Sequence, residues 1–338
     1  MTAKENPAAT IRAERKPSAR RHRAAIAALG VAALTAASAL AVGGGAGRAE
    51  AAVATNCAAK PSTCGYPDAT NTGVPAGTTL KQVPGQATSG PGWSYNASTS
   101  TVTVTANGTT LSGLAITGTL QISANNVTVK NVKVTSGGTF GISLAHTSGV
   151  TIENSTISGQ NSTTGRVSYA IDDVYGDSTG MIIKADDISS FRTAVQVSIG
   201  QVDSNYIHDP GYVAGDHTNG IYVNGGTQSL MIWNNTIFDS LGQTDAINLD
   251  AGTPGPAAPV AYKTVSDNLL AGGAYTLYGG AASGSPTSNI VVQDNRFGQN
   301  YYAKSGQYGP AYYFDAAGAG NKWSMNIWDT TGQTVPSP

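Results

Sequence analysis

The sequence predicts an all-β parallel β-helix, a solenoid in which each turn of the chain (a coil) stacks on the previous one. Three observations lead to this prediction. Few stretches show the 3.6-residue apolar period of a helix. A phrase of the form apolar-x-apolar-x-Asn/Asp-x-x-apolar recurs along the chain, and a second type of short strand lies between its copies. Such repeats of about 20–30 residues are typical of stacked β coils.

The first 51 residues read as a signal peptide. A basic leader containing Arg20 and Arg21 precedes an Ala-rich apolar run at 24–42, and small residues follow at 49–54. The residues around the Arg pair fit a twin-arginine signal poorly. The run has no stop-transfer flank, which disfavours a permanent membrane span. We therefore expect a secreted, extracellular protein that has no membrane association after cleavage.

The charge balance changes when this leader is set aside. It holds eight of the nineteen Lys and Arg and three of the twenty Asp and Glu, so the rest of the chain carries 11 basic and 17 acidic residues, a formal net charge of −6. Nucleic-acid binding depends on neutralising phosphates and does not suit such a surface. We expect no nucleic-acid partner, and an acidic substrate would need local cations.

Residues 52–106 form the predicted N-terminal lead-in and cap. They contain the two cysteines of the chain, Cys57 and Cys64. In an exported chain this pair favours a disulfide that closes a small loop. A thiol or metal site would need further ligands.

The recurring phrase predicts a β-helix over residues 107–330, followed by a flexible tail at 331–338. The polar position of the phrase falls every 19–33 residues, at 131, 154, 185, 204, 234, 267 and 294. An Asn or Asp side chain there fits a turn in which the backbone adopts left-handed φ. We therefore assign Asn131, Asn154 and Asn234 a structural role. A β-sandwich or up-and-down barrel is the competing architecture, but it lacks a self-similar phrase.

The second strand type predicts how side chains are divided between the core and the surface. Because side chains alternate along a strand, its apolar residues should stack in an inner column: Ile142, Val195, Ile221, Ile247 and Leu277. The outer column is then Ser143, Asp172, Gln196, Tyr222, Asn248 and Tyr278. Small residues beside it should form a shallow floor: Gly141, Ala170, Ala194, Gly220, Ala246 and Thr276. A floor with a polar wall suits an extended polymer such as a glycan.

Candidate catalytic groups gather on three successive strands of this type. Acid–base chemistry needs one group that accepts a proton and another that donates one. The candidates are His217, Asp245, Tyr278, Lys263 and Asp250. The neighbouring polar side chains that we expect to bind substrate are Asn219, Tyr222, Asn248, Gln196 and Asp216. Each has a structural alternative as a turn former, a surface aromatic or a solvated charge.

Asp172 and Asp173 form a second candidate site. Asp173 falls where the alternation requires an apolar residue. Paired carboxylates hold Ca²⁺ through oxygen ligands, so Ca²⁺ is the one cofactor that the sequence suggests. An ion pair with Arg192 is the structural alternative.

The aromatic segment at 296–329 follows the last repeat. An open end of a β-helix is a sheet edge that needs cover. We therefore favour a capping role for this segment over a sugar-stacking platform.

The chain resembles the right-handed parallel β-helix superfamily of pectate-lyase-like proteins, of the secreted actinobacterial type. The resemblance rests on the repeats "NVTVKNVKV", "GVTIENSTI" and "LMIWNNTIF", on the strands "HTNGIYV" and "TDAINLD", and on the lead-in "NTGVPAGTTL". It implies a single-stranded, right-handed helix and activity on uronate-rich glycans. Polygalacturonase-type hydrolases carry four motifs in a fixed order. Here "QTDAI" and "IDDV" stand in reversed order and the other two are missing.

These observations lead to three hypotheses of function. The first is a polysaccharide lyase that cleaves a uronic-acid-containing glycan by β-elimination, with His217 or Lys263 as base and Tyr278 as acid. Asn219 and Asn248, or a cation held by acids, would neutralise the uronate carboxylate. The second is a glycoside hydrolase that uses two of Asp216, Asp245 and Asp250. The third is a non-catalytic glycan-binding protein. In each case we expect a monomer whose partner is an extracellular polysaccharide.

Overall fold

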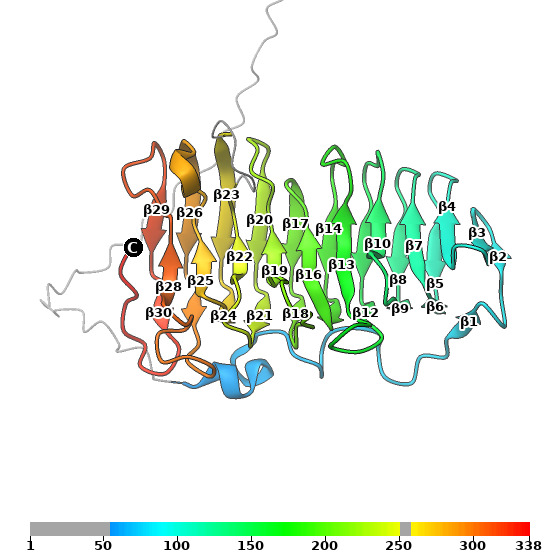
Figure 1. Cartoon of the computed structure of the whole chain (residues 1–338), viewed down its shortest axis with the longest axis horizontal. Helices are drawn as coiled ribbons and strands as arrows, with labels where there is room; N and C mark the ends of the chain where they lie inside the picture. The colour runs from blue at the N-terminus through cyan, green and yellow to red at the C-terminus, as the bar shows by residue number, and fades with distance from the viewer. Residues whose placement is uncertain (1–54, 251–257) are drawn as a thin grey trace, which may run out of the picture. The chain divides into compact units, whose positions relative to one another are not determined.

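The computed structural model describes residues 55–250 and 258–338. The predicted signal peptide lies outside these residues. The described chain is all-β, with three short 3₁₀ helices. No helix in this part of the chain is long and apolar enough to span a membrane. Strands from successive coils lie side by side in long sheets (Figure 1).

Three sheets contain all the strands that the structure describes. Sheet A has ten strands: β1 (Lys81–Val83), β6 (Leu114–Thr117), β9 (Lys133–Thr135), β12 (Thr156–Ser158), β15 (Asp187–Ser189), β18 (Tyr206–Ile207), β21 (Thr236–Asp239), β24 (Leu269–Gly272), β27 (Arg296–Phe297) and β30 (Ile327–Trp328). Sheet B has eleven: β2 (Ser89–Gly90), β3 (Trp93–Asn96), β4 (Thr101–Val104), β7 (Thr119–Ile122), β10 (Phe140–Leu144), β13 (Val167–Asp173), β16 (Phe191–Gln196), β19 (Asn219–Tyr222), β22 (Asp245–Asn248), β25 (Tyr275–Tyr278) and β28 (Gly309–Tyr312). Sheet C has nine: β5 (Thr110–Ser112), β8 (Thr128–Lys130), β11 (Thr151–Glu153), β14 (Ile182–Lys184), β17 (Gly200–Asp203), β20 (Leu230–Trp233), β23 (Val260–Ser266), β26 (Thr287–Gln293) and β29 (Lys322–Ser324).

From β4 the chain visits the three sheets in turn, and each strand pairs with the strand three places along, whereas β1 pairs with β6 and β2, β3 and β4 form an antiparallel ribbon. From β4 onward these pairs are parallel. This topology fits a parallel β-helix with three strands in each coil. The recurring phrase of the sequence spans the bend between sheet C and sheet A, as in β11 and β12. Parallel stacking begins with β4 and β1, before the boundary at 107 that the sequence analysis expected.

The inner column of sheet B is confirmed. Ile142 pairs through Ile171 with Val195, and the column continues strand by strand to Ile247 and Leu277. Each of these side chains is fully buried. The outer column is confirmed by the same pairings, from Ser143 to Tyr278. The apolar core therefore runs without interruption along the stack of coils.

The small-residue column does not form a surface floor. Ala170, Ala194 and Ala246 are fully buried, and a side chain added at Gly220 would lie 2.4 Å from Cγ2 of the core residue Ile237. This column faces the interior at the bend between sheets A and B. The expectation was wrong because strict alternation was assumed along strands that bend at this position.

The expected left-handed turns are present between sheets C and A. Asn131, Asn154 and Asn234 have φ of 52°, 49° and 52°. An amide side chain tolerates this region better than most residues. The structural role that the phrase predicts for these asparagines agrees with this geometry.

A buried polar ladder follows these turns at the next residue, which the sequence analysis missed. From Asp186 onward, each ladder side chain accepts a hydrogen bond from the backbone N–H of the ladder residue one coil earlier. Each Asn Nδ2 also donates to a backbone carbonyl of that earlier coil. All members are fully buried: Ser155, Asp186, Asn205, Asn235, Asn268, Asn295 and Asn326. The ladder satisfies the backbone groups that the turns leave free inside the protein.

Asp186 is the one acid in this ladder. Its Oδ1 accepts from Ser155 N at 2.7 Å, but its Oδ2 has no hydrogen-bond partner among the described residues. In the Asn members of the ladder, the atom at this place is Nδ2, which donates to backbone and side-chain oxygens. Oδ2 of Asp186 therefore takes the place of a hydrogen-bond donor. Burial raises the pKa of Asp186 well above its ordinary value, which favours a protonated carboxyl at a position where the neighbouring coils have an amide.

We therefore predict that Asp186→Asn stabilises the fold, and increasingly so as pH rises. The folded pKa is raised, so the contribution of Asp186 is fully present below about pH 4, the unfolded value, and is lost as pH rises through the folded pKa. Asn does not titrate. Urea unfolding from pH 4 to pH 9 should show the stability difference between variant and wild type growing with pH. The reverse swap, Asn205→Asp, should lose stability over the same range, and a pH-independent difference would contradict the assignment.

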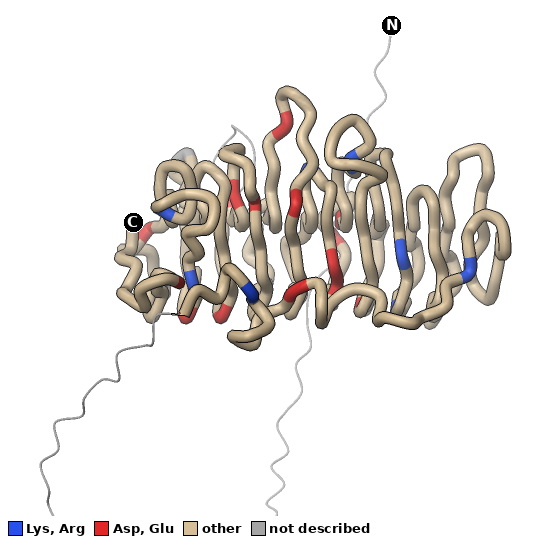
Figure 2. Tube along the Cα trace, turned by 90° about the horizontal axis from the view of Figure 1, so that it is seen from below, with Lys and Arg blue, Asp and Glu red and all other residues tan. Residues whose placement is uncertain are grey.

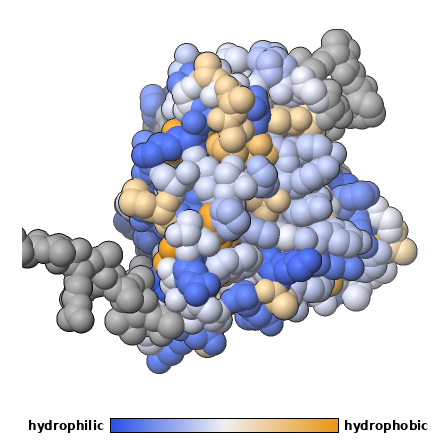
Figure 3. Space-filling model, turned by 90° about the vertical axis from the view of Figure 1, so that its left-hand side faces the viewer, coloured by the Kyte–Doolittle hydropathy of each residue, from blue (hydrophilic) through white to orange (hydrophobic). Residues whose placement is uncertain are grey.

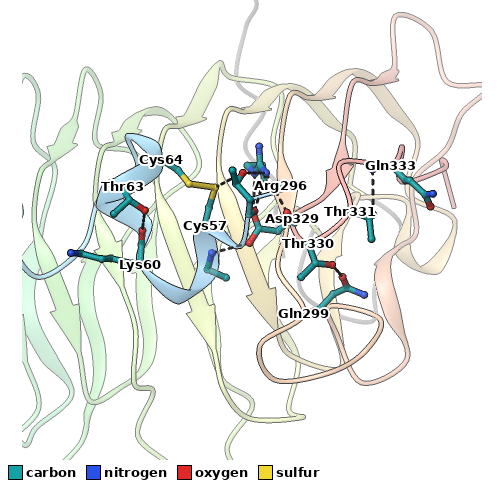
Figure 4. A network of polar contacts seen from close by, with 12 residues as sticks. Cys57, Lys60, Thr63, Cys64, Arg296, Gln299, Asp329, Thr330, Thr331 and Gln333 are labelled. Carbon is teal, nitrogen blue, oxygen red and sulfur yellow. Dashed lines mark hydrogen bonds and ion pairs between the residues drawn. A yellow bond between two sulfur atoms is a disulfide. The ribbon is translucent and has the colours of Figure 1, made fainter. Parts of the chain in front are cut away.

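The N-terminal segment lies along sheet A instead of over the end of the stack. The 3₁₀ helices η1 (Cys57–Ala59) and η2 (Pro61–Cys64) sit beside the C-terminal coils, where Ala58 N donates to Asp329 Oδ2 at 2.8 Å (Figure 4). Arg296 Nε donates to the other oxygen of the same carboxylate. The chain then runs along sheet A, where Gly73 N bonds Ala185 O, and joins the opposite edge through β1. The cap at the first coil is thus the antiparallel β2–β3–β4 ribbon, whose Trp93 and Tyr95 pack on the core.

The expected disulfide between Cys57 and Cys64 is present. Cys57 is buried against Phe238, Leu269 and Ala271. We predict that replacing both cysteines by Ser lowers the unfolding free energy by about 2–3 kcal/mol. Turnover should be unchanged, because this cluster lies on sheet A. A melting curve and an activity assay on the double variant test both parts, and a folded variant with lost activity would contradict the second.

The aromatic segment near the C-terminus covers the last coil in part. Phe314, Trp323 and Trp328 pack against the core, and Trp323 Nε1 donates to Val335 O at 2.9 Å. Val335 is fully buried. One apolar side chain of the segment at 331–338 is therefore packed, whereas most of its other residues are exposed. Viewed from this end, the surface is largely hydrophilic with small apolar patches (Figure 3).

Candidate functional site

A groove crosses the outer face of sheet B over β13, β16, β19 and β22. We call it the His217 groove, and its volume is about 350 Å³. It is lined by Tyr169, Arg192, Thr193, Gln196, His217, Asn219, Tyr222, Thr244 and Asn248. Two outward columns supply most of these side chains. One contains Tyr169, Thr193 and Asn219, and the other contains Gln196, Tyr222 and Asn248.

His217 stands at the edge of this groove, two residues before β19. Its side chain is exposed, and its Nδ1 lies 3.3 Å from Thr244 Oγ1. Asn219 Nδ2 donates to the His217 carbonyl at 3.1 Å. Thr244 is in the left-handed region, with φ of 64°, at the turn that leads into β22. Two successive coils therefore position this imidazole.

Arg192 supplies the positive charge of the groove. Its guanidinium carbon lies 4.4 Å from the ring centroid of Tyr169, a cation–π arrangement. No carboxylate of the described residues lies within 4.0 Å of it. The cation is thus oriented by an aromatic face, and its charge favours the ionised forms of Asp172 and Asp216 without a direct ion pair. Along the described part of the chain the Lys and Arg residues are spaced apart (Figure 2).

No carboxylate lines the His217 groove in the part of the chain that the structure describes. Asp245 is fully buried, and its Oδ2 accepts from Asn248 Nδ2 at 3.0 Å. Burial and, secondly, the nearby Asp239 raise the pKa of Asp245 well above its ordinary value. Burial also raises the pKa of Asp239 to about 8. By register Asp245 continues the column of Tyr169, Thr193 and Asn219, where its carboxylate holds the Asn248 amide through this hydrogen bond.

Asp250 follows the same strand. Its N–H donates to Asn248 Oδ1 at 2.9 Å, so that both ends of the Asn248 amide are fixed. Burial raises the pKa of the Asp250 carboxyl to about 6. Asp250 does not line the groove.

The two tyrosines predicted for the site differ in position. Tyr222 lines the groove, and burial, followed by the Asp245 charge, raises its pKa. A raised pKa favours the protonated phenol, which can donate a proton or a hydrogen bond. Tyr278 lies one strand pair beyond Asn248 in a cluster with Tyr275, Tyr312 and Tyr313, and burial raises its pKa further. It does not line the groove.

Lys263 does not join the predicted constellation. It lies on β23 of sheet C and is fully buried, and its Nζ donates to Ser198 O at 2.8 Å and Gln228 O at 2.6 Å. Burial lowers its pKa to about 8. The ammonium ties neighbouring coils together at the bend from sheet B to sheet C. The sequence placed it near the tyrosine only because the two are close along the chain.

Asp216 is also engaged elsewhere. Arg166 Nε and Nη2 bond its two carboxylate oxygens, and Val213 N donates to it at 2.8 Å. Although burial acts in the opposite direction, the hydrogen bonds from Arg166 and Val213 give Asp216 a lowered pKa. This ion pair joins two loops that are 50 residues apart in sequence. Asp216 therefore does not line the groove, contrary to its expected role in substrate binding.

The pair Asp172 and Asp173 is divided between the two faces of β13. Asp172 continues the outer column, and Asp173 replaces an apolar residue opposite Leu144, as the sequence indicated. Ser178 N donates to both Asp173 oxygens. Burial, then the neighbouring Asp173, raises the pKa of Asp172 to about 7. The described residues contain no cluster of three or more His, Cys, Asp or Glu side chains that would complete a metal site.

Four groove residues were not among the predicted site residues: Tyr169, Arg192, Thr193 and Thr244. The register contains the signal that would have found three of them. Tyr169 and Thr193 occupy the column of Asn219, and Arg192 precedes this column on β16. Thr244 lies in a turn and has no repeat position.

Comparison of the chain with protein-family models, with curated proteins and with solved structures found no match.

Proposed function

We propose that this protein is a secreted right-handed parallel β-helix of the pectate-lyase-like superfamily and acts as a polysaccharide lyase on a uronic-acid-containing glycan. The repeats and the three parallel sheets support the fold. The His217 groove supports the reaction, because it brings together a guanidinium, an imidazole, two phenols and three amides on one sheet face.

β-Elimination needs three groups, and the groove supplies each. Arg192 and the Asn219 and Asn248 amides bind the uronate carboxylate and stabilise the charge that develops on it. His217 accepts the proton from the carbon next to that carboxylate. Tyr222 donates its proton to the glycosidic oxygen as the carbon–oxygen bond breaks. The products are an unsaturated uronate and a new hydroxyl end. Tyr222 thus takes the acid role first expected of Tyr278, and Lys263 takes no part.

The observation that carries this proposal over hydrolysis is the lack of carboxylates among the groove's lining residues. A glycoside hydrolase needs two carboxyl groups that flank the scissile bond. Here Asp245 is fully buried, bonds Asn248 and does not line the groove. Charge neutralisation by a cation together with proton transfer by imidazole and phenol fits elimination better.

A product screen on a panel of uronic-acid polymers tests the proposal. A lyase releases fragments with the ultraviolet absorbance of an unsaturated uronate. Reducing ends without that absorbance would identify a hydrolase. Binding without new ends would identify a glycan-binding protein.

A further inference from the structure

A second groove lies on the outer face of sheet B, over β4, β7 and β10. We call it the Gln121 groove. Its volume is about 440 Å³, larger than that of the His217 groove. It is lined by Thr99, Thr101, Thr119, Gln121, Gly138, Thr139, Phe140, Ser143, Ala145, Val174 and Tyr175.

The lining of the Gln121 groove is polar but uncharged. Hydroxyl and amide side chains project from neighbouring strands, with Gln121 paired with Ser143 and Thr101 paired with Thr119. Thr119 Oγ1 donates to Phe140 O at 2.9 Å, so this hydroxyl is oriented. Among the residues that the structure describes, no Lys, Arg, Asp or Glu lines the groove. Such a surface can exchange hydrogen bonds with hydroxyl groups but offers no counter-ion to a carboxylate.

Two aromatic rings border the Gln121 groove, and one of them is exposed to solvent but held in a fixed orientation. Tyr175 is 62% exposed, yet its ring stacks on His146 with centroids 4.2 Å apart and an interplanar angle of 12°. His146 Nδ1 is in turn 2.6 Å from Asp177 Oδ2. An exposed ring with a fixed orientation loses little side-chain freedom when a flat apolar surface stacks on it.

The two grooves are adjacent and meet at a pair of stacked aromatic rings. Phe140, which lines the Gln121 groove, stacks on Tyr169 of the His217 groove with centroids 6.0 Å apart. Arg192 covers Tyr169 from the next strand. The outer column also continues without a break from Gln121 through Ser143 and Asp172 to Gln196. One extended molecule on this face would contact both grooves.

We infer that the Gln121 groove binds neutral sugar units of the same polymer whose uronate occupies the His217 groove. A neutral pyranose offers C–H faces to Phe140 and Tyr175 and hydroxyls to Thr101, Gln121 and Ser143. A uronate there would have no cation. The natural substrate is therefore a mixed glycan in which neutral sugars adjoin the uronate that is cleaved. The link to cleavage depends on the proposed function, whereas neutral-sugar binding does not.

Calorimetric titration of His217→Ala protein with neutral hexasaccharides tests the binding. The probes are gluco-, galacto-, manno- and xylo-oligosaccharides. At least one should bind, and adding Tyr175→Ala should weaken that binding by about ten-fold, as expected for the loss of one stacked ring. Gln121→Ala should also weaken it. Tyr262→Ala, which removes a 54% exposed ring on sheet C, is the matched control and should have no effect. Failure of all four probes to bind, or equal affinity without Tyr175, overturns the inference.

Kinetics separate this inference from the proposed function. On a mixed polymer, Tyr175→Ala in the active protein should raise KM with kcat unchanged, and on a uronate homopolymer both constants should stay as in wild type. If the protein is a lyase but Tyr175→Ala changes KM by the same factor on both polymers, the proposed function stands and the inference is overturned. If the protein binds neutral sugars through Tyr175 but has no lyase activity, the inference stands and the proposed function is overturned.

Discussion

Replacing His217 by Ala should lower kcat on a uronate polymer by about 10²–10⁴-fold, the usual contribution of a positioned acid–base group. The side chain is exposed and contacts Thr244 only through a 3.3 Å hydrogen bond. Its removal leaves no cavity in the core, so the melting temperature should stay within about 1 °C of wild type. Steady-state kinetics and a melting curve on the same preparation measure both effects.

The control for His217→Ala is Lys130→Ala. Lys130 lies on β8 of sheet C in an exposed ion pair with Glu153 and should change neither quantity measurably. Full turnover in His217→Ala would remove the imidazole from the mechanism. The base would then have to be sought around Asp172, whose pKa of about 7 also suits proton transfer.

Asn235→Ala should destabilise the fold by about 3–5 kcal/mol. Asn235 is fully buried, and its Oδ1 accepts from Asn205 N at 2.9 Å while its Nδ2 donates to Val202 O at 2.9 Å. Alanine leaves these groups buried without partners, at about 1–3 kcal/mol each, and adds a small cavity. Equilibrium unfolding in urea gives the difference in free energy.

The neighbouring residue provides the matched comparison for Asn235. Asn234 occupies the left-handed turn, with φ of 52°, and its Nδ2 donates to Ser204 Oγ at 3.1 Å. Asn234→Ala should cost only about 1 kcal/mol, the strain of alanine in that region. Equal losses at the two positions would mean that the ladder bonds contribute no more than the turn.

The sequence predicted the backbone path better than the polar interior. Alternation within strands such as 219–222 and 245–248 was enough to identify the buried column through Ile221 and Ile247. The ladder was missed because the aligned polar position marks the turn, while the buried amide stands one residue later, as in the pair Asn234 and Asn235. Sequence periodicity shows that a polar pair recurs, but only the path of the turn decides which member faces inward.

The candidate site was predicted where it follows strand register and missed where it depends on distant contacts. Asn219, Tyr222 and Asn248 line the groove because register carries them to one face. Lys263 and Asp216 do not, since one extends into the protein from another sheet and the other pairs with a residue 50 positions away. Neither the Lys263 contact nor the Asp216 ion pair can be recognised from the residues next to them in the sequence.

The regular stacking of strands in sheet B fixes distances along its outer face in equal steps. Ser143 and Asn248 stand in one column with four strand-to-strand steps between them. At about 4.8 Å a step, they are separated by about 19 Å. A coil inserted into this column or deleted from it would change that separation by one whole step, close to the length of a single sugar in an extended chain. The distance between a bound neutral unit and the bond that is cut can therefore change only by whole multiples of the strand spacing, as coils are gained or lost.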